Sequence, residues 1–310
     1  MKKILEVNSL NVTFPTRNGR IRASQNISFH VNEGEICVLV GETGSGKSVI
    51  GQSVLHLLPE SAEITGSIRY FGREILMISE EKYAPLRGKE ISLIPQNPGG
   101  SLDPIMKNGK QITEVLDEND SKEKKAGSVS DILLRLGFLN PGLVVDSYPH
   151  ELSGGMRQRL TTGIALASKS RLLIADEPTK GLDYAARKKT MEMFSRLKEN
   201  KLDSILMITH DLDLAGIIGD TVGVMYSGEL VEFGKVKDVF SSPKHPYTRG
   251  LLKALPKNGM IPMPGISPGL GDLPAGCYFH ERCDICCSEG ETVHPDWYFG
   301  DGRGVRCHQY

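Results

Sequence analysis

The chain has 310 residues, of which 39% are hydrophobic and 24% charged, and its 37 Lys+Arg nearly balance its 38 Asp+Glu, for a formal net charge of −1 at pH 7. This composition is ordinary for a globular protein with a buried core, and the balanced charge argues against a strongly basic nucleic-acid binder. No apolar run approaches the ~18 residues of a membrane span, and the first residues lack the sustained apolar stretch of a signal peptide, so we expect neither a span nor secretion.

The first half of the chain predicts strands followed by helices. Residues 1–40 are typical of β-strands joined by turns, and EICVLV at their end is a short apolar strand. A helix is expected over residues 47–58, ended by Pro59, and residues 91–96 are again strand-like. Residues 99–165 predict mainly helices, with breaks at Pro104, Gly127, Pro141 and Pro149.

The second half alternates strands and helices before its character changes. Three β-rich runs, at residues 171–176, 204–210 and 221–226, are separated by helical patterns. This order favours a mostly parallel sheet covered by helices. From Ser241 to Gly276 the chain is rich in Pro and Gly and is expected to form an extended connector.

The sequence GETGSGKS at residues 41–48 fits the phosphate-binding pattern G-x-x-x-x-G-K-[ST], between an apolar strand and a helix. Glycines let successive backbone N–H groups face phosphate oxygens, and the helix N-terminus adds the positive end of its dipole. We expect Lys47 to reach the β- and γ-phosphates and Ser48 to bind Mg²⁺. A chance glycine-rich turn is the alternative, which the flanking elements disfavour. The predicted nucleotide-binding residues are Gly41, Glu42, Thr43, Gly44, Ser45, Gly46, Lys47 and Ser48.

An acidic pair ends the apolar strand predicted at residues 171–176. Asp176 is expected to hold Mg²⁺, commonly through water, and Glu177 stands where a base could polarise the attacking water. A helix cap or an ion-paired acidic pair is the alternative, and the phosphate-binding loop makes it the weaker one. We therefore predict Asp176 as a magnesium-binding residue and Glu177 as a catalytic residue.

The sequence LSGGMRQR at residues 152–159 resembles the signature motif of ATP-binding-cassette (ABC) ATPases. As in that family, it follows the phosphate-binding loop and precedes the strand that ends in the acidic pair. The resemblance implies an α/β P-loop NTPase cassette, with a RecA-like core, a mixed sheet and a helical subdomain. It also implies two cassettes that enclose two ATP molecules, each signature facing the γ-phosphate of the opposite subunit. A Ser-capped helix describes the same residues structurally. The signature residues assigned to nucleotide binding are Ser153, Gly154, Gly155 and Gln158.

Further residues resemble family elements in the expected order. Gln96 resembles the Q-loop glutamine, which senses Mg²⁺ and links to the membrane partner, and Asp183 resembles the D-loop aspartate, although Lys180–Gly181 replaces the usual small pair. His210 resembles the switch histidine that contacts the γ-phosphate, and Phe14 resembles the aromatic residue that stacks on adenine. A structural histidine and a core phenylalanine are the alternatives. With the hydrolytic positions filled, the resemblance implies an active ATPase that uses ATP and Mg²⁺.

Later motifs narrow the resemblance to the ATPases of oligopeptide, dipeptide and nickel importers. Six stretches resemble that group: residues 96–104, 109–114, 241–248, 251–256, 276–283 and 305–307. Met156 resembles the first (D-type) of the two ATPases in such systems, which implies a heterodimer with a sister ATPase, with a homodimer as the alternative. We predict an ABC nucleotide-binding domain at residues 1–240, its helical subdomain at about 97–167, and a C-terminal extension at 241–310.

The resemblance implies an ATP-hydrolysing subunit that powers import of peptides or related small solutes, with nickel as a further option. Its partners would be a sister ATP-binding subunit, two transmembrane permease subunits and an extracytoplasmic substrate-binding protein, with no nucleic acid. It would lie peripherally at the cytoplasmic face of the cell membrane. A soluble ABC ATPase acting on the ribosome or on nucleic acid is the alternative, but such proteins usually carry two cassettes or a long coiled-coil insertion.

Five of the six cysteines lie in the last 34 residues. In a chain that is not secreted, such a cluster predicts a metal site before a disulfide framework. The resemblance implies a [4Fe–4S] cluster, with structural Zn²⁺ as the second interpretation and free thiols as the third. The spacing Cys283-x-x-Cys286 is the commoner chelating one, whereas the order of the family pattern favours Cys287. The expected ligands are Cys277, Cys283, Cys287 and Cys307, with Cys286 as the alternative to Cys287.

Overall fold

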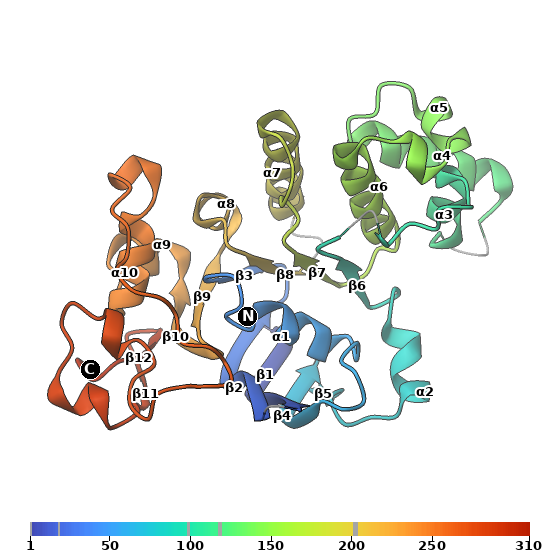
Figure 1. Ribbon diagram of the computed structural model, residues 1–310. Helices are drawn as coiled ribbons and strands as arrows, with labels where there is room; N and C mark the ends of the chain where they lie inside the picture. Colours follow the sequence, from blue (N-terminus) through green and yellow to red (C-terminus); the bar gives the residue numbers. More distant parts are fainter. Residues whose placement is uncertain (1, 18, 98–99, 117–119, 201–203) are drawn as a thin grey trace. The chain divides into compact units, whose positions relative to one another are not determined.

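The computed structural model describes residues 2–17, 19–97, 100–116, 120–200 and 204–310 (Figure 1). The chain folds as two compact units: unit 1 comprises the residues up to 79 and from 206 to 310, and unit 2 comprises residues 80–205. Within the described ranges, no helix is long and apolar enough to cross a membrane. The two units are described separately below.

Unit 1 contains an antiparallel sheet built by the N-terminal part of the chain. Its order is β2-β1-β4-β5, and each neighbouring pair is antiparallel. Its strands are β1 (Lys3–Thr16), β2 (Gly19–Asn32), β4 (Glu63–Tyr70) and β5 (Arg73–Glu74). The strands expected in the first 40 residues are confirmed.

A second, mixed sheet forms the centre of unit 1. Its order there is β11-β12-β10-β9-β3-β8. Strands β3 and β9 are parallel, with Val38 opposite Val222, whereas β9, β10, β12 and β11 are antiparallel neighbours. The strands are β3 (Ile36–Val40), β8 (Ser204–Thr209), β9 (Thr221–Tyr226), β10 (Glu229–Lys235), β11 (Trp297–Gly300) and β12 (Arg303–Arg306). The last hairpin thus extends the same sheet that carries the phosphate-binding loop.

The helices of unit 1 differ from expectation in two places. They are α1 (Lys47–Val54), α8 (Leu212–Ile218), α9 (Val236–Ser241) and α10 (Pro246–Lys253), with short 3₁₀ turns η4 (Pro256–Asn258), η5 (His280–Arg282) and η6 (Ser288–Glu291). The helix expected to continue to Pro59 ends earlier, because His56 adopts a left-handed φ of 54°. The extended connector expected from Ser241 is wrong over α10, where Pro246 occupies the first turn and His245 caps the helix.

Within its described residues, unit 2 contains strands β6 and β7, the first two residues of β8 and most of the long helices. Strands β6 (Ile91–Ile94) and β7 (Leu172–Asp176) pair in parallel. The helices are α2 (Glu80–Tyr83), α3 (Asn108–Glu114), α4 (Lys122–Arg135), α5 (Pro141–Asp146), α6 (Gly154–Ala167) and α7 (Tyr184–Asn200), with 3₁₀ turns η1 (Ala84–Leu86) and η3 (Pro149–Glu151). The break expected at Gly127 is wrong: α4 continues through this exposed position, where a glycine costs only about 1 kcal/mol relative to alanine.

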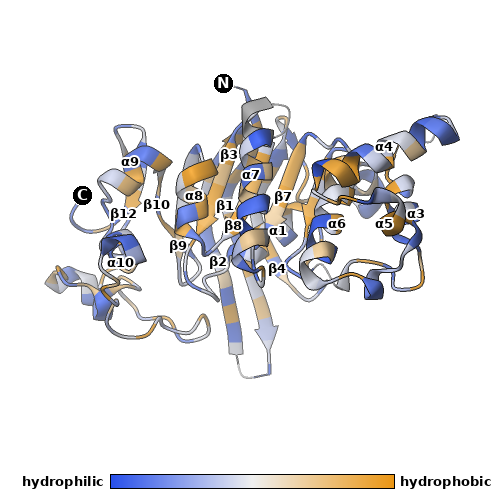
Figure 2. Ribbon diagram, turned by 90° about the horizontal axis from the view of Figure 1, so that it is seen from above, coloured by the Kyte–Doolittle hydropathy of each residue, from blue (hydrophilic) through white to orange (hydrophobic). Residues whose placement is uncertain are grey.

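Each unit has an apolar core of its own. Strands β3 and β7 are buried along their whole length and are orange in Figure 2, as expected for strands covered on both faces. The helices of unit 2 enclose a separate cluster around Ile112, Leu133 and Leu160, each 0% exposed. These cores fix the strand ends and helix starts at which the candidate site residues lie.

Candidate functional site

The phosphate-binding loop leaves the buried end of β3 and enters α1 within unit 1. Gly41, Gly44 and Gly46 have φ values of 152°, 85° and 93°, which favour glycine. A Cβ on Gly46 would lie 2.0 Å from the backbone oxygen of Ala23, and one on Gly41 would lie 2.2 Å from that of Met225. Both contacts are with backbone that cannot move aside, so two of these glycines are required by space as well as by conformation.

The ammonium group of Lys47 is held inside this loop. Its Nζ donates to the backbone oxygens of Gly41 (2.8 Å) and Glu42 (2.7 Å) and to Ser45 Oγ (3.2 Å), and the residue is 6% exposed. Ser48 follows in the first turn of α1 and is half-buried, whereas Thr43 and Gly44 are exposed. The loop therefore closes around a positive charge and presents its outer backbone to solvent, an arrangement suited to an anionic ligand.

The acidic pair lies at the carboxyl end of β7 in unit 2. Asp176 is the last residue of the strand, and both Asp176 and Glu177 are buried, at 9% and 6% exposure. Glu177 adopts a left-handed φ of 50°, an uncommon conformation for a residue with a side chain. Backbone strain of this kind costs on the order of 1–3 kcal/mol and clusters at functional sites.

The predicted signature motif begins helix α6. Ser153 is the N-cap, and its Oγ accepts a hydrogen bond from the Met156 N–H at 3.3 Å. Gly154 is exposed, and a Cβ there would meet nothing within 4 Å, whereas Gly155 is half-buried. Gln158 is buried and donates from Nε2 to the backbone oxygen of Pro178 at 3.0 Å. The motif thus has an open helix start and one side chain that ties it to the segment after β7.

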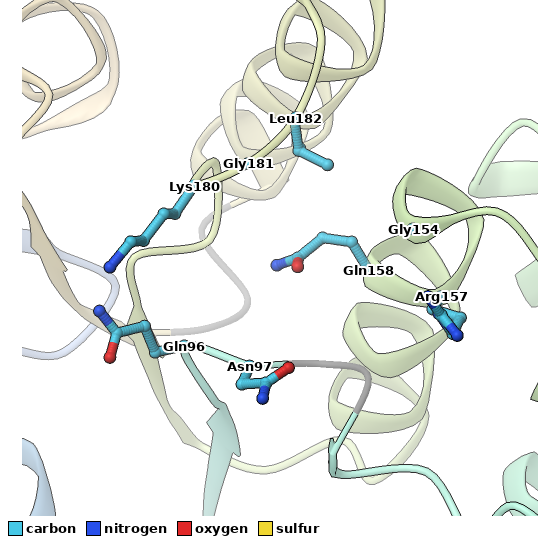
Figure 3. Close-up of a pocket in the computed structure, with 8 residues that line it drawn as sticks. All are labelled: Gln96, Asn97, Gly154, Arg157, Gln158, Lys180, Gly181 and Leu182. Atoms are coloured by element: carbon cyan, nitrogen blue, oxygen red, sulfur yellow. The ribbon is translucent and has the colours of Figure 1, made fainter.

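Three of the predicted motifs line one cavity of about 430 Å³ within unit 2 (Figure 3). Its lining residues are Gln96, Asn97, Gly154, Arg157, Gln158, Lys180, Gly181 and Leu182. Gln158 projects from α6 toward the segment that carries Lys180 and Leu182. The structure therefore brings Gln96, the start of α6 and the segment from Lys180 to Leu182 together, and the exposed Asp183 follows directly.

The remaining predicted residues lie at element ends or edges. Gln96 is exposed just beyond β6, and His210 is exposed just beyond β8, where Asp211 caps helix α8. Phe14 is half-buried in β1, opposite Ile21 of β2. Pro98 and Gly99, part of the stretch 96–104, lie outside the described residues.

The tail cysteines do not form the metal site that the sequence predicts. All six cysteines are free thiols, and no three His, Cys, Asp or Glu side chains in the described ranges stand close enough to hold a metal ion. Burial raises the pKa of Cys277 to about 11 and also raises the pKa of Cys283 and Cys307, and the neighbouring thiols add to each shift. As placed, Cys277, Cys283, Cys287 and Cys307 do not fit a [4Fe–4S] cluster or Zn²⁺, and exchanging Cys287 for Cys286 does not change this.

Sequence reasoning missed the side chains that hold the loop from outside. The Glu42 carboxylate accepts two hydrogen bonds from Arg282, at 3.1 and 3.0 Å, although the two residues are 240 positions apart. Tyr247 and Ser267 also hydrogen-bond Glu42. The available signals were the opposite charges and the position of Arg282 beside Cys283, and neither specifies a partner.

Comparison with known proteins assigns both parts of the chain. Residues 24–180 match the family described as ABC transporter, and residues 231–289 match the family described as oligopeptide/dipeptide transporter, C-terminal region. The chain is 38% identical to the dipeptide transport ATP-binding protein DppD of Bacillus subtilis, over 96% of this chain and 93% of that protein. It is 40% identical to the oligopeptide transport ATP-binding protein OppD of Salmonella typhimurium, over 98% and 93%.

Solved structures agree on the fold. A dimeric ATP-binding cassette in a post-hydrolysis state, bound to ADP and Pi, matches with a TM-score of 0.67 and 22% identity, over 75% of this chain and 98% of that one. CbiO1 of Clostridium perfringens, part of the ABC transporter complex cbiONQ, matches with a TM-score of 0.65 and 26% identity, over 78% and 92%. The predicted cassette fold, with mixed sheet and helices, is confirmed.

Proposed function

Because this chain belongs to the ABC transporter family as an ATP-hydrolysing subunit, we propose that the transporter it powers imports dipeptides or oligopeptides. The observation that carries this proposal is the match of residues 231–289 to the oligopeptide/dipeptide C-terminal region, on top of the cassette match. No relative named above points to nickel, the ribosome or nucleic acid, so these alternatives are not favoured.

We propose a role in ATP binding and hydrolysis for each of the residues that the sequence predicts. Lys47 would bind the β- and γ-phosphates with the loop amides, and Ser48, Gln96 and Asp176 supply the oxygen donors that suit Mg²⁺, which neutralises phosphate charge when bound. Glu177 would take a proton from the attacking water and His210 would contact the γ-phosphate. The buried, left-handed position of Glu177 supports its assignment, because such a conformation fixes the carboxylate at the strand end.

The partners follow from the family and from the open start of α6. The exposed Ser153 and Gly154 support a signature motif that receives the γ-phosphate of a second ATP-binding subunit, either a sister protein or a second copy. Two permease subunits and an extracytoplasmic substrate-binding protein would complete an importer, with this chain peripheral at the cytoplasmic face. The domain boundaries at about 97–167 and at 240, the D-loop role of Asp183 and adenine stacking by Phe14 remain predictions.

A metal centre in the tail is a prediction on which none of these steps depends. Among the described residues no three metal-ligating side chains stand together, so metal binding would require the tail cysteines to rearrange. Iron, acid-labile sulfide and zinc are to be measured in protein purified without oxygen. A colourless protein that contains only zinc would reject the [4Fe–4S] cluster, and a metal-free protein would reject both.

The central test is the Glu177→Gln variant. We expect it to bind ATP with the wild-type Kd and to lose hydrolysis by roughly 10²-fold or more, because the amide cannot accept the proton. Glu192→Gln, at an exposed position of α7, is the matched control and should hydrolyse normally. Hydrolysis at the wild-type rate in Glu177→Gln would remove Glu177 from its role. In liposomes with the permeases and binding protein, peptide should stimulate hydrolysis and Ni²⁺ should not.

A further inference from the structure

An ion pair between the buried Arg282 and the half-buried Glu42 joins the C-terminal region to the phosphate-binding loop within unit 1. Arg282 donates from Nη1 to Glu42 Oε2 at 3.1 Å and from Nη2 to Oε1 at 3.0 Å, a two-pronged geometry. The Arg282 side chain is 5% exposed and that of Glu42 is 34% exposed. Ser267 completes the contact by donating to Glu42 and accepting from Arg282 Nη1 at 2.8 Å. The bidentate geometry, the burial of Arg282 and the third hydrogen-bonding residue distinguish this pair from an ion pair between two exposed side chains.

Contacts other than the one with Glu42 also hold the Arg282 side chain in place. Arg282 is the last residue of the turn η5, which lies between Cys277 and Cys283, and its Nε donates to the backbone oxygen of Pro264 at 2.9 Å. Its guanidinium lies 5.6 Å from the ring centre of Tyr226 and 5.8 Å from that of Phe279. Little side-chain entropy is therefore lost when the ion pair forms, which favours a strong and well-directed contact.

The backbone of Glu42 is fixed as well. Its N–H donates to the hydroxyl of Tyr247 at 2.9 Å, and its carbonyl accepts from Lys47 Nζ at 2.7 Å. Tyr247 is 0% exposed and packs its ring against Tyr226, with 4.6 Å between the ring centres. The second residue of the loop is thus held through its amide, its carbonyl and its carboxylate, two of them by the C-terminal region.

The charge of Glu42 gives this contact a role in binding. Burial alone would raise the pKa of the Glu42 carboxyl, but hydrogen bonds from Arg282 and Ser267 outweigh burial and lower it, so the group is ionised. A carboxylate inside a loop that binds phosphates repels them unless a cation neutralises it. Arg282 supplies that cation from a side chain that is not part of the loop.

We propose that Arg282, assisted by Ser267 and Tyr247, is a positioning residue for the phosphate-binding loop, so that the affinity for ATP depends on the C-terminal region. Arg282 neutralises Glu42 and the three side chains hold the loop in its closed form before the ligand arrives, which lowers the cost of ordering it. The inference rests on the proposed function, in which this loop binds ATP.

The test is a double-mutant cycle on the full-length chain, read as the Kd for ATP by calorimetric titration. Arg282→Gln should raise the Kd roughly 10-fold, because an unpaired carboxylate then faces the triphosphate. Glu42→Gln in the same protein should bring the Kd back to within about threefold of wild type, because the repulsion is gone. Lys257→Gln is the control, since it removes a tail ion pair with Asp213 (2.9 Å) that does not touch the loop, and its Kd should not change.

Two further readouts separate positioning from a general loss of fold. Arg282→Gln should raise KM for ATP and leave kcat within about twofold, because it does not touch the catalytic carboxylate. Tyr247→Phe keeps the ring packing and removes one hydroxyl, so it should raise the Kd by about threefold and serves if Arg282→Gln does not fold.

The possible outcomes are distinct. A wild-type Kd in both Arg282→Gln and Tyr247→Phe would overturn the inference, and so would a raised Kd that Glu42→Gln fails to restore. If the wild-type chain does not bind ATP, or if Lys47→Ala binds it equally well, then the proposed function fails and not this inference alone.

Discussion

The buried imidazole of His245 makes the C-terminal region sensitive to acid. His245 is 1% exposed, and its Nδ1 accepts the N–H of Tyr247 at 3.0 Å, so the ring must be neutral on that side. Burial lowers its pKa to about 3, and the cation of Arg249 adds to the effect. Because the folded-state pKa is depressed, the stabilising contribution is complete above the ordinary pKa of 6.5 and is lost as the pH falls from there toward 3.

The expected fall in the free energy of unfolding follows from the pKa of His245 in the unfolded chain, 6.5, and in the folded chain, about 3. Between pH 7 and pH 5 the unfolded chain takes up most of a proton at His245 and the folded chain takes up almost none, so the free energy of unfolding should fall by about 2 kcal/mol. Arg249 is the charged group that acts on the ring, whereas the backbone N–H of His245 donates to Glu232 at 3.0 Å, and Glu232 is itself paired with Arg303. The expected change is therefore large compared with the error of an unfolding measurement.

Urea unfolding at pH 7, 6 and 5, with fluorescence of Trp297 as the probe, measures how the free energy of unfolding depends on pH. Trp297 is the single tryptophan of the chain and lies in β11, so its signal reports on unit 1 near the C-terminal region. The comparison is with His245→Asn, which keeps an oxygen to cap α10 and does not titrate. Wild-type stability should fall relative to the variant by about 2 kcal/mol from pH 7 to pH 5. A difference that does not change with pH would refute the reasoning.

Two further predictions concern other parts of unit 1. Gly46→Ala should abolish detectable ATP binding, because its Cβ would lie 2.0 Å from the backbone oxygen of Ala23. Gly44→Ala shares the left-handed φ, but its Cβ would meet nothing within 4 Å, so this variant should still bind ATP, with a Kd raised by less than about 10-fold. Equilibrium titration with ATP compares the two variants. Arg303→Met should lower the free energy of unfolding by about 3–5 kcal/mol, because it leaves the 0% exposed Glu232 without its cation, and equal stability of variant and wild type in urea would contradict this.

The parts of the site that the sequence predicts are those formed by neighbouring residues. The loop at residues 41–48 and the helix start at Ser153 depend on glycine conformations and capping within one turn, so a short pattern identifies them. The strands β3 and β7 are recognisable because both of their faces are buried and their residues are apolar, apart from Asp176 at the end of β7.

The parts that the sequence does not predict depend on contacts between distant residues. Nothing local to Glu42 indicates that its carboxylate pairs with Arg282, because the pairing follows from the sheet that brings the two ends of unit 1 together. Helix α10 lies in a Pro-rich stretch, and its first turn forms because Pro246 fits there and the buried His245 caps it. The cysteines cluster in sequence, but the turns between them do not bring three of them to one point.

The first turn of α10 connects His245 to Glu42, so protonation of His245 and the anchoring of the phosphate-binding loop are coupled. Neutral His245 caps α10, the cap places Tyr247, and the Tyr247 hydroxyl receives the Glu42 N–H. Protonation of His245 removes the acceptor that starts α10, and the loop loses one of its anchors in the same step. Linkage then requires the reverse effect, in which a ligand that needs the closed loop stabilises α10 and the tail by the same free energy. On this proposal the C-terminal region contributes to the nucleotide site in unit 1, although no residue of it belongs to a nucleotide-binding motif.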